Sequence, residues 1–201
     1  MKVIIISGPT GSGKTTLSKR ILNKFQNGIE LSTDNYYKAD LMSKILSKIV
    51  DGYFDRKISF NYNLFKKDFK YICKNGKSDH IYSYNFIKKT IKRSYKKKTN
   101  IEYIIVEGIF TKSILRNLRK HNFLYIELET SKESCMKRVI NRDLIERGKS
   151  KHLAENDFLK SWNIYYCKDY HSENCLNKLV YTQKTNIYKE IKKNLNLKTD
   201  I

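Results

Sequence analysis

The chain has 201 residues, a length typical of one domain, and a formal net charge of +21 from 41 Lys and Arg against 20 Asp and Glu. The lysines are spread along the whole chain, and residues with A/T-rich codons are abundant. We therefore attribute most of the charge to genome composition and expect no specific nucleic-acid partner. The four cysteines form no C-x-x-C pair, and no apolar run is long enough for a signal-peptide core or a membrane span. We expect a cytoplasmic protein with free thiols.

Strands and helices alternate along the predicted chain. Continuous β-branched runs indicate buried strands, and apolar residues at helical spacing indicate helices. The alternation also places a helix, without fixed bounds, between the third and fourth strands. In chain order we expect strand 3–7, helix 15–25, strand 29–32, helices 41–50 and 64–73, strands 101–106 and 123–128, helices 131–146 and 157–170, strand 178–182 and helix 187–195. This alternation predicts an α/β fold with a central parallel sheet covered by helices on both faces.

Three segments give weaker signals. Residues 54–63 show no period, and residues 81–87 alternate weakly, as an extended segment would. Residues 90–98 are very basic, and we interpret them as an exposed loop or helix end. In the helix predicted at 41–50, one apolar stripe is formed by Leu41, Ile45, Leu46 and Ile49.

The segment GPTGSGKT at residues 8–15 fits the pattern G-x-x-x-x-G-K-[ST] in full, between a predicted strand and an amphipathic helix. Gly11 and Gly13 permit backbone conformations closed to other residues, so that successive N–H groups form a phosphate nest. We expect Lys14 to be an exposed charge that reaches the β- and γ-phosphates, and Thr15 to coordinate Mg²⁺. The predicted ATP- or GTP-binding residues here are Gly8, Pro9, Thr10, Gly11, Ser12, Gly13, Lys14, Thr15 and Thr16.

Two acids follow predicted strands, at the edge of the sheet where ligands bind in such folds. Asp34 follows the second strand and is either a base for an attacking hydroxyl or a helix N-cap. Glu107 ends the strand at 101–106 and is either a Mg²⁺-binding acid or a charged residue that starts a loop.

A basic segment follows the fourth strand. Arg138 and Arg142 are four residues apart and share a helical face, and Arg147 precedes Gly148, which suits a mobile lid. Guanidinium groups bind phosphate oxygens, but a solvated helix face stabilised by neighbouring acids gives the same pattern.

The motifs GPTGSGKTTLSK, TDNYYKADL, FDRKISFNYNLF, YNF, IIVEGIF and RDLIERGKS stand in an order and spacing that resemble the uridine kinase (uridine–cytidine kinase) family of P-loop nucleoside kinases. The resemblance runs from residue 1 to about residue 181. It implies a P-loop fold of three layers in one domain, with a nucleoside-binding insertion at about 52–98 and a helical lid at about 142–156. It also suggests self-association.

The resemblance implies roles for individual residues. For the nucleoside, it implies a catalytic base at Asp34, an aromatic neighbour at Tyr37, a ribose-binding carboxylate at Asp55, and a base pocket that includes Tyr84, Phe86 and Lys89. For the phosphates, it implies Glu107 near Mg²⁺, lid arginines at Arg142 and Arg147, and Lys149 where the family often has arginine.

The chain also departs from the family pattern. Lys89 stands where the family has a histidine that recognises the pyrimidine, and Val139 stands in place of a family arginine, with Arg138 one residue earlier as a substrate-binding candidate. Phosphate and catalytic positions are kept, whereas base-recognition positions are changed.

The function expected from these residues is Mg²⁺-dependent transfer of phosphate from ATP or GTP to the 5′-hydroxyl of a pyrimidine nucleoside, in pyrimidine salvage. Two alternatives remain at this point. One is a kinase of another small alcohol, such as nicotinamide riboside or a pantothenate-like substrate, and the other is a non-catalytic P-loop protein that binds nucleotide or RNA.

Overall fold

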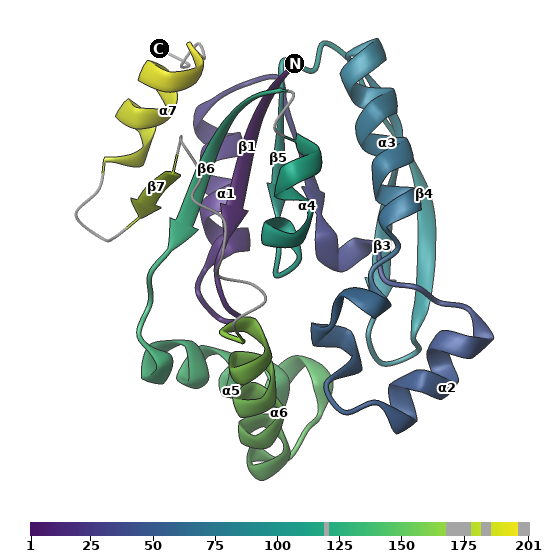
Figure 1. Cartoon of the computed structure of the whole chain (residues 1–201). Helices are drawn as coiled ribbons and strands as arrows, with labels where there is room; N and C mark the ends of the chain where they lie inside the picture. The colour runs from purple at the N-terminus through teal and green to yellow at the C-terminus, as the bar shows by residue number, and fades with distance from the viewer. Residues whose placement is uncertain (119–120, 168–177, 182–185, 197–201) are drawn as a thin grey trace.

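A parallel five-stranded sheet lies at the centre of the computed structural model, which describes residues 1–118, 121–167, 178–181 and 186–196 (Figure 1). The strand order is β2-β5-β1-β6-β7, and every hydrogen-bonded pair is parallel. The strands are β1 (Lys2–Ser7), β2 (Gly28–Ser32), β5 (Tyr103–Glu107), β6 (Asn122–Leu128) and β7 (Lys178–Tyr181). The five predicted strands and the predicted parallel sheet are thus confirmed.

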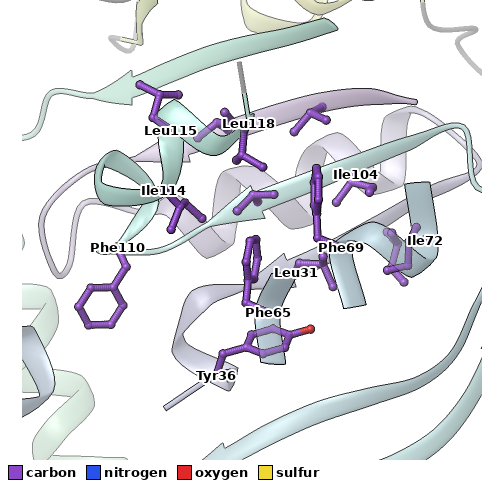
Figure 2. Close-up of a cluster of buried hydrophobic side chains, with 14 of the residues drawn as sticks. Leu31, Tyr36, Phe65, Phe69, Ile72, Ile104, Phe110, Ile114, Leu115 and Leu118 are labelled. Atoms are coloured by element: carbon purple, nitrogen blue, oxygen red, sulfur yellow. The ribbon is translucent and has the colours of Figure 1, made fainter. Parts of the chain in front are cut away.

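Alternate residues of β1, β5 and β6 enter two separate cores, because successive side chains of a strand point to opposite faces. Ile4 and Ile6 pack with α1 (Lys14–Lys24) and α7 (Ile187–Leu195) on one face. Val3 and Ile5 pack on the other face with α3 (Tyr62–Asn75) and α4 (Thr111–Leu118). Figure 2 shows side chains of α3 and α4 gathered over strand residues of that face. The result is the predicted arrangement of helix, sheet and helix layers.

The segment between β2 and β5 lies beside the sheet (Figure 1). It contains α2 (Leu41–Ile49), α3 and an antiparallel hairpin of β3 (Ser78–Asn85) and β4 (Thr90–Lys98). Short 3-10 turns cover 53–55 and 57–59, where the sequence shows no period. The interpretation of 90–98 as a loop or helix end was wrong. Most of the β4 side chains are exposed, so this strand lacks the alternation that marks a half-buried strand.

Two consecutive helices, α5 (Lys132–Arg147) and α6 (Lys151–Tyr165), pack together near the carboxyl ends of the strands (Figure 1). The Ser131 cap of α5 accepts a hydrogen bond from the Ser134 N–H. The predicted start of α6 at residue 157 was wrong, because Ser150 caps the helix by accepting from the Leu153 N–H. Residues 168–170, the predicted end of that helix, lie outside the described residues.

The predicted stripe of α2 lies mostly on the solvent side. Leu41, Ile45 and Ile49 are exposed, while Ser43 is the buried residue of this helix. Within the described ranges, no helix is long and apolar enough to cross a membrane. Cys73, Cys135 and Cys167 are free thiols, and Cys175 lies outside the described residues.

Candidate active site

The P-loop follows β1, and its backbone lies against α5. Gly11 has a φ of 78°, and a Cβ there would lie 2.5 Å from the Cys135 carbonyl oxygen, so both backbone conformation and space require glycine. Gly13, with a φ of 99°, is the N-cap of α1, and Thr15 and Thr16 begin that helix with exposed side chains. The helix N-terminus therefore opens on the loop that encloses the phosphate site.

Lys14 is buried, so the expectation of an exposed charge was wrong. Its Nζ donates a hydrogen bond to the Pro9 carbonyl oxygen at 2.8 Å, and its exposed fraction is 7%. Burial lowers the pKa of Lys14, and the nearby carboxylates Glu107 and Asp34 oppose this shift. The ammonium group is thus held inside the loop, between the backbone and two acids.

Asp34 lies inside a 3-10 turn, Thr33–Asn35, directly after β2. The cap of this turn is Ser32, whose hydroxyl accepts from the Asp34 N–H at 3.3 Å, so the N-cap alternative for Asp34 was wrong. Its Oδ1 is buried without a hydrogen-bond partner. Burial raises the pKa of Asp34, and the charges of Lys14 and Arg142 oppose the rise. A buried carboxylate next to two cations is chemically able to accept a proton.

Glu107 is buried at the end of β5, level with Ser32 of β2 and Ile6 of β1 in the strand register. Burial and the nearby Asp34 raise the pKa of Glu107 to about 7, and Lys14 opposes the rise. Oxygen ligands of this kind suit Mg²⁺, and Thr15 offers a hydroxyl at the P-loop. A buried carboxylate beside the phosphate nest fits such an ion, although no cluster of three or more acidic, His or Cys ligands occurs among the described residues.

A cavity of about 610 Å³ extends from the P-loop residue Thr10 to α2 and α6. Asp34 and Asp55 both line it, at separate turns of the chain. Burial raises the pKa of Asp55 to about 6, and a hydrogen bond from Ser161 opposes this rise. The volume lies in the usual range for small-molecule sites. Its walls therefore offer two carboxylates to one ligand.

Aromatic rings form part of the wall of this cavity. Tyr37, Phe54 and Phe86 line it, and the Tyr37 and Phe86 ring centroids are 5.4 Å apart. Tyr84 is not on the wall but packs 5.1 Å behind both Tyr37 and Phe86. Lys89 is also not among the lining residues, but its Nζ donates at 2.8 Å to the Oγ of Ser47, which lines the cavity. Tyr84 and Lys89 thus lie one layer behind residues that line the cavity, and their contact with a base stays a prediction.

Cations from the end of α5 and the following turn converge on one buried acid, Asp143. Arg142 donates from Nε and Nη2 to Asp143 Oδ1 at 3.0 and 2.8 Å. Arg147 and Lys149 contact Asp143 Oδ2 at 3.4 and 3.0 Å, and Lys149 also contacts Asp157 at 2.8 Å. Arg142, Arg147 and Lys149 line the cavity, so the helix-face explanation and the phosphate-binding one are compatible.

Arg138 lies elsewhere than expected. It donates from Nη1 to the Gly11 carbonyl oxygen at 3.2 Å, on the P-loop side, and does not line the cavity. The spacing of four residues placed Arg138 and Arg142 on one helical face, and so it did not predict that only Arg142 lines the cavity. Asp157 and Ser161 line the cavity as well, and the sequence gave no signal for them beyond their shared face of a helix.

The fold and this site define a P-loop kinase, and comparison with known proteins gives the family. The profile of the Phosphoribulokinase / Uridine kinase family matches residues 3–172. The chain is 32% identical over 168 residues to a uridine kinase of Borrelia hermsii, covering 83% of this chain and 79% of that protein. It is 29% identical over 163 residues to a uridine kinase of Staphylococcus aureus, covering 78% and 75%. The chain belongs to the Phosphoribulokinase / Uridine kinase family.

Solved structures show a similar fold. A putative fructose transport system kinase from Silicibacter sp. TM1040 superposes with a TM-score of 0.64 at 15% identity, covering 90% of this chain and 89% of that chain. A D-glycerate 3-kinase from Cryptococcus neoformans has a TM-score of 0.58 at 16% identity, covering 89% and 84%. At such identities the likeness concerns the fold alone.

Proposed function

We propose that this protein transfers the γ-phosphate of ATP or GTP to the 5′-hydroxyl of a pyrimidine nucleoside, with uridine preferred, and acts in pyrimidine salvage. The observation that carries the proposal is one cavity lined by the P-loop residue Thr10, by the carboxylates of Asp34 and Asp55, and by aromatic rings. A nucleoside has a 5′-hydroxyl, a sugar diol and a flat nucleobase. We assign the 5′-hydroxyl to Asp34 as proton acceptor, the diol to Asp55, and the nucleobase to the aromatic rings. The similarity to uridine kinases supports the same substrate class.

The transfer needs positioning and charge neutralisation more than covalent chemistry. The 5′-oxygen attacks the γ-phosphorus, the bond to the β–γ bridging oxygen breaks, and the hydroxyl proton passes to Asp34. The nucleoside diphosphate and nucleoside monophosphate leave. Lys14, Arg142 and Arg147 supply positive charge around Asp34, as their opposing influence on its pKa indicates. Mg²⁺, held by Thr15 and Glu107, would neutralise phosphate charge.

Selectivity among pyrimidines is proposed to rest on Lys89. Its Nζ lies 5.7 Å from the ring centroid of Phe54, which lines the cavity. An ammonium group has three donors and no acceptor, and Ser47 uses one of the donors. A remaining N–H can meet a uracil carbonyl, whereas the cytosine amino group gains nothing from a donor. Uridine should therefore be used better than cytidine.

The experiment compares kcat/KM for uridine, cytidine, adenosine, nicotinamide riboside and pantothenate in the wild type and in Asp34→Asn. Asp34→Asn keeps the shape but cannot take the proton, so kcat should fall by roughly 10²- to 10⁴-fold while ATP affinity barely changes. A non-pyrimidine favoured tenfold or more would contradict the substrate. Absence of turnover with every alcohol, with salt-sensitive RNA binding, would favour the non-catalytic alternative.

A further inference from the structure

The cavity contains a hydroxyl group, that of Ser161, to which the reaction above gives no role. Ser161, on α6, is buried and donates from Oγ to Asp55 Oδ1 at 2.7 Å. Among the residues that the structure describes, no other side chain donates a hydrogen bond to Asp55. The second carboxylate oxygen is therefore left for a ligand.

The chain at residues 51–55 and the helix α6 contact each other at more than one point. Lys160, beside Ser161, donates from Nζ to Asp51 Oδ1 at 2.7 Å, but this pair is exposed. A Cβ on Gly52 would lie 2.4 Å from Ile164 Cδ1. The backbone just before the turn at 53–55 therefore lies close to α6. Asp51 and Asp55 both line the cavity, but only the Asp55 contact has a buried donor, because Ser161 is buried whereas Lys160 is exposed.

The surroundings make this hydrogen bond electrostatically important. Asp34 and Asp157 raise the pKa of Asp55 together with burial, and the Lys149 ammonium lowers it. Tyr37 lines the same cavity, and its pKa is raised by burial, then by Asp34 and Asp55. A hydrogen bond to the charged form of a carboxylate favours that form. Ser161 acts here in the same direction as Lys149.

We propose that Ser161 is a positioning residue for the substrate: its hydroxyl fixes the Asp55 carboxylate as the acceptor for the sugar hydroxyls. The inference rests on the proposed function, which supplies the sugar. Because Ser161 belongs to α6, it also sets the sugar position relative to the helix that follows the lid arginines. Loss of the hydroxyl should weaken nucleoside binding and leave the transfer step itself nearly unchanged.

The test uses Ser161→Ala, Ser161→Thr and the matched control Lys160→Ala, which removes the neighbouring contact between the same segments. In Ser161→Ala the nucleoside KM at pH 7 should rise roughly tenfold, the effect of one hydrogen bond to a charged group, with kcat within about twofold. The acidic limb of 1/KM, and the Asp55 carboxyl pKa followed by ¹³C NMR, should move up by about one pH unit. Ser161→Thr should restore both.

The sugar contact is tested with 2′- and 3′-deoxynucleosides and the 2′,3′-dideoxynucleoside. The rise in KM caused by Ser161→Ala should become smaller as sugar hydroxyls are removed, because Asp55 accepts hydrogen bonds from those hydroxyls. An unchanged KM in Ser161→Ala, an equal rise in Lys160→Ala, or the same penalty on the dideoxynucleoside would each overturn the role of Ser161 while the proposed function stands. Absence of nucleoside turnover in the wild type would instead overturn the proposed function, and the sugar contact with it.

Discussion

The guanidinium carbon of Arg147 lies 4.7 Å from the ring centroid of Phe86, so a cation at the end of α5 rests on an aromatic ring at the end of β3. The same side chain donates to Asp143 at 3.4 Å. Both partners line the cavity. The cation that we propose to bind phosphate is thereby linked to the wall on which a base would rest.

Arg147→Ala should lower kcat more than it raises the nucleoside KM, because the charge that Arg147 meets grows in the transition state. Arg147→Lys should recover only part of the loss, since lysine cannot reproduce a planar guanidinium on a ring. Steady-state kinetics check both variants. Lys151→Ala, at an exposed site of α6, is the control and should behave as the wild type. A change confined to KM would contradict a transition-state role.

The same segment is expected to act as a lid, with Gly148 at a φ of 62° between α5 and α6. Amide hydrogen exchange across residues 142–152 should slow when an analogue that joins nucleoside and phosphates binds. The comparison region is α3, which packs in the core away from the lid and should not respond. Equal protection in the free and bound forms would speak against a lid.

Gly11 and Gly148 make a matched pair, because both have left-handed backbone but only Gly11 is crowded. A Cβ at Gly11 would meet the Cys135 carbonyl at 2.5 Å, whereas a Cβ at Gly148 would meet nothing within 4 Å. Gly148→Ala should cost about 1 kcal/mol of unfolding free energy. Gly11→Ala should cost more and abolish nucleotide binding. Denaturant melts and ATP titrations check this, and tight ATP binding by Gly11→Ala would contradict it.

The sequence predicted the sheet well because β1 and β5 are buried on both faces and so consist of continuous apolar runs. It failed at β4, where lysines are exposed and pairing with β3 decides the conformation. It also identified the helix at 41–49 but could not show that Leu41 faces solvent, since the orientation of a stripe depends on tertiary packing.

The site divides in the same way. The P-loop and the acids after β2 and β5 follow from local pattern and strand position, so the sequence could place Asp34 and Glu107 at one edge of the sheet. The Ser161 contact joins residues 106 positions apart in the chain, so no local pattern encodes it. The burial of Lys14 depends on the folded loop, in which its Nζ turns back to the Pro9 carbonyl. Arg138 shows the limit, because its place on a predicted helix face did not reveal that it contacts the Gly11 carbonyl rather than the cavity.

Lys14→Ala should abolish phosphoryl transfer without destabilising the fold. The removed ammonium is buried, and burial disfavours its charged form, so its loss should leave the melting temperature unchanged or raised. Turnover should fall by at least roughly 10²-fold, since transition-state charge loses its nearest cation. An ADP-release assay and a thermal melt check both parts. Lys19→Ala, an exposed position of α1, is the control, and near-normal turnover in Lys14→Ala would refute the assignment.

Asp55→Asn should stabilise the protein at pH 8 while it weakens nucleoside binding. The native state raises the Asp55 pKa from 3.8 to about 6, so it holds the proton more tightly than the unfolded chain does. Stability conferred by this group is therefore complete below about pH 4 and falls as the pH rises toward 6. Asparagine removes that penalty, which should raise the melting temperature at pH 8 by a few degrees, with the gap closing near pH 4. Asp51→Asn, which removes a carboxylate whose side chain is 72% exposed, is the matched control. A melting temperature of Asp55→Asn at or below that of the wild type at pH 8 would mean that the native site does not destabilise the Asp55 charge.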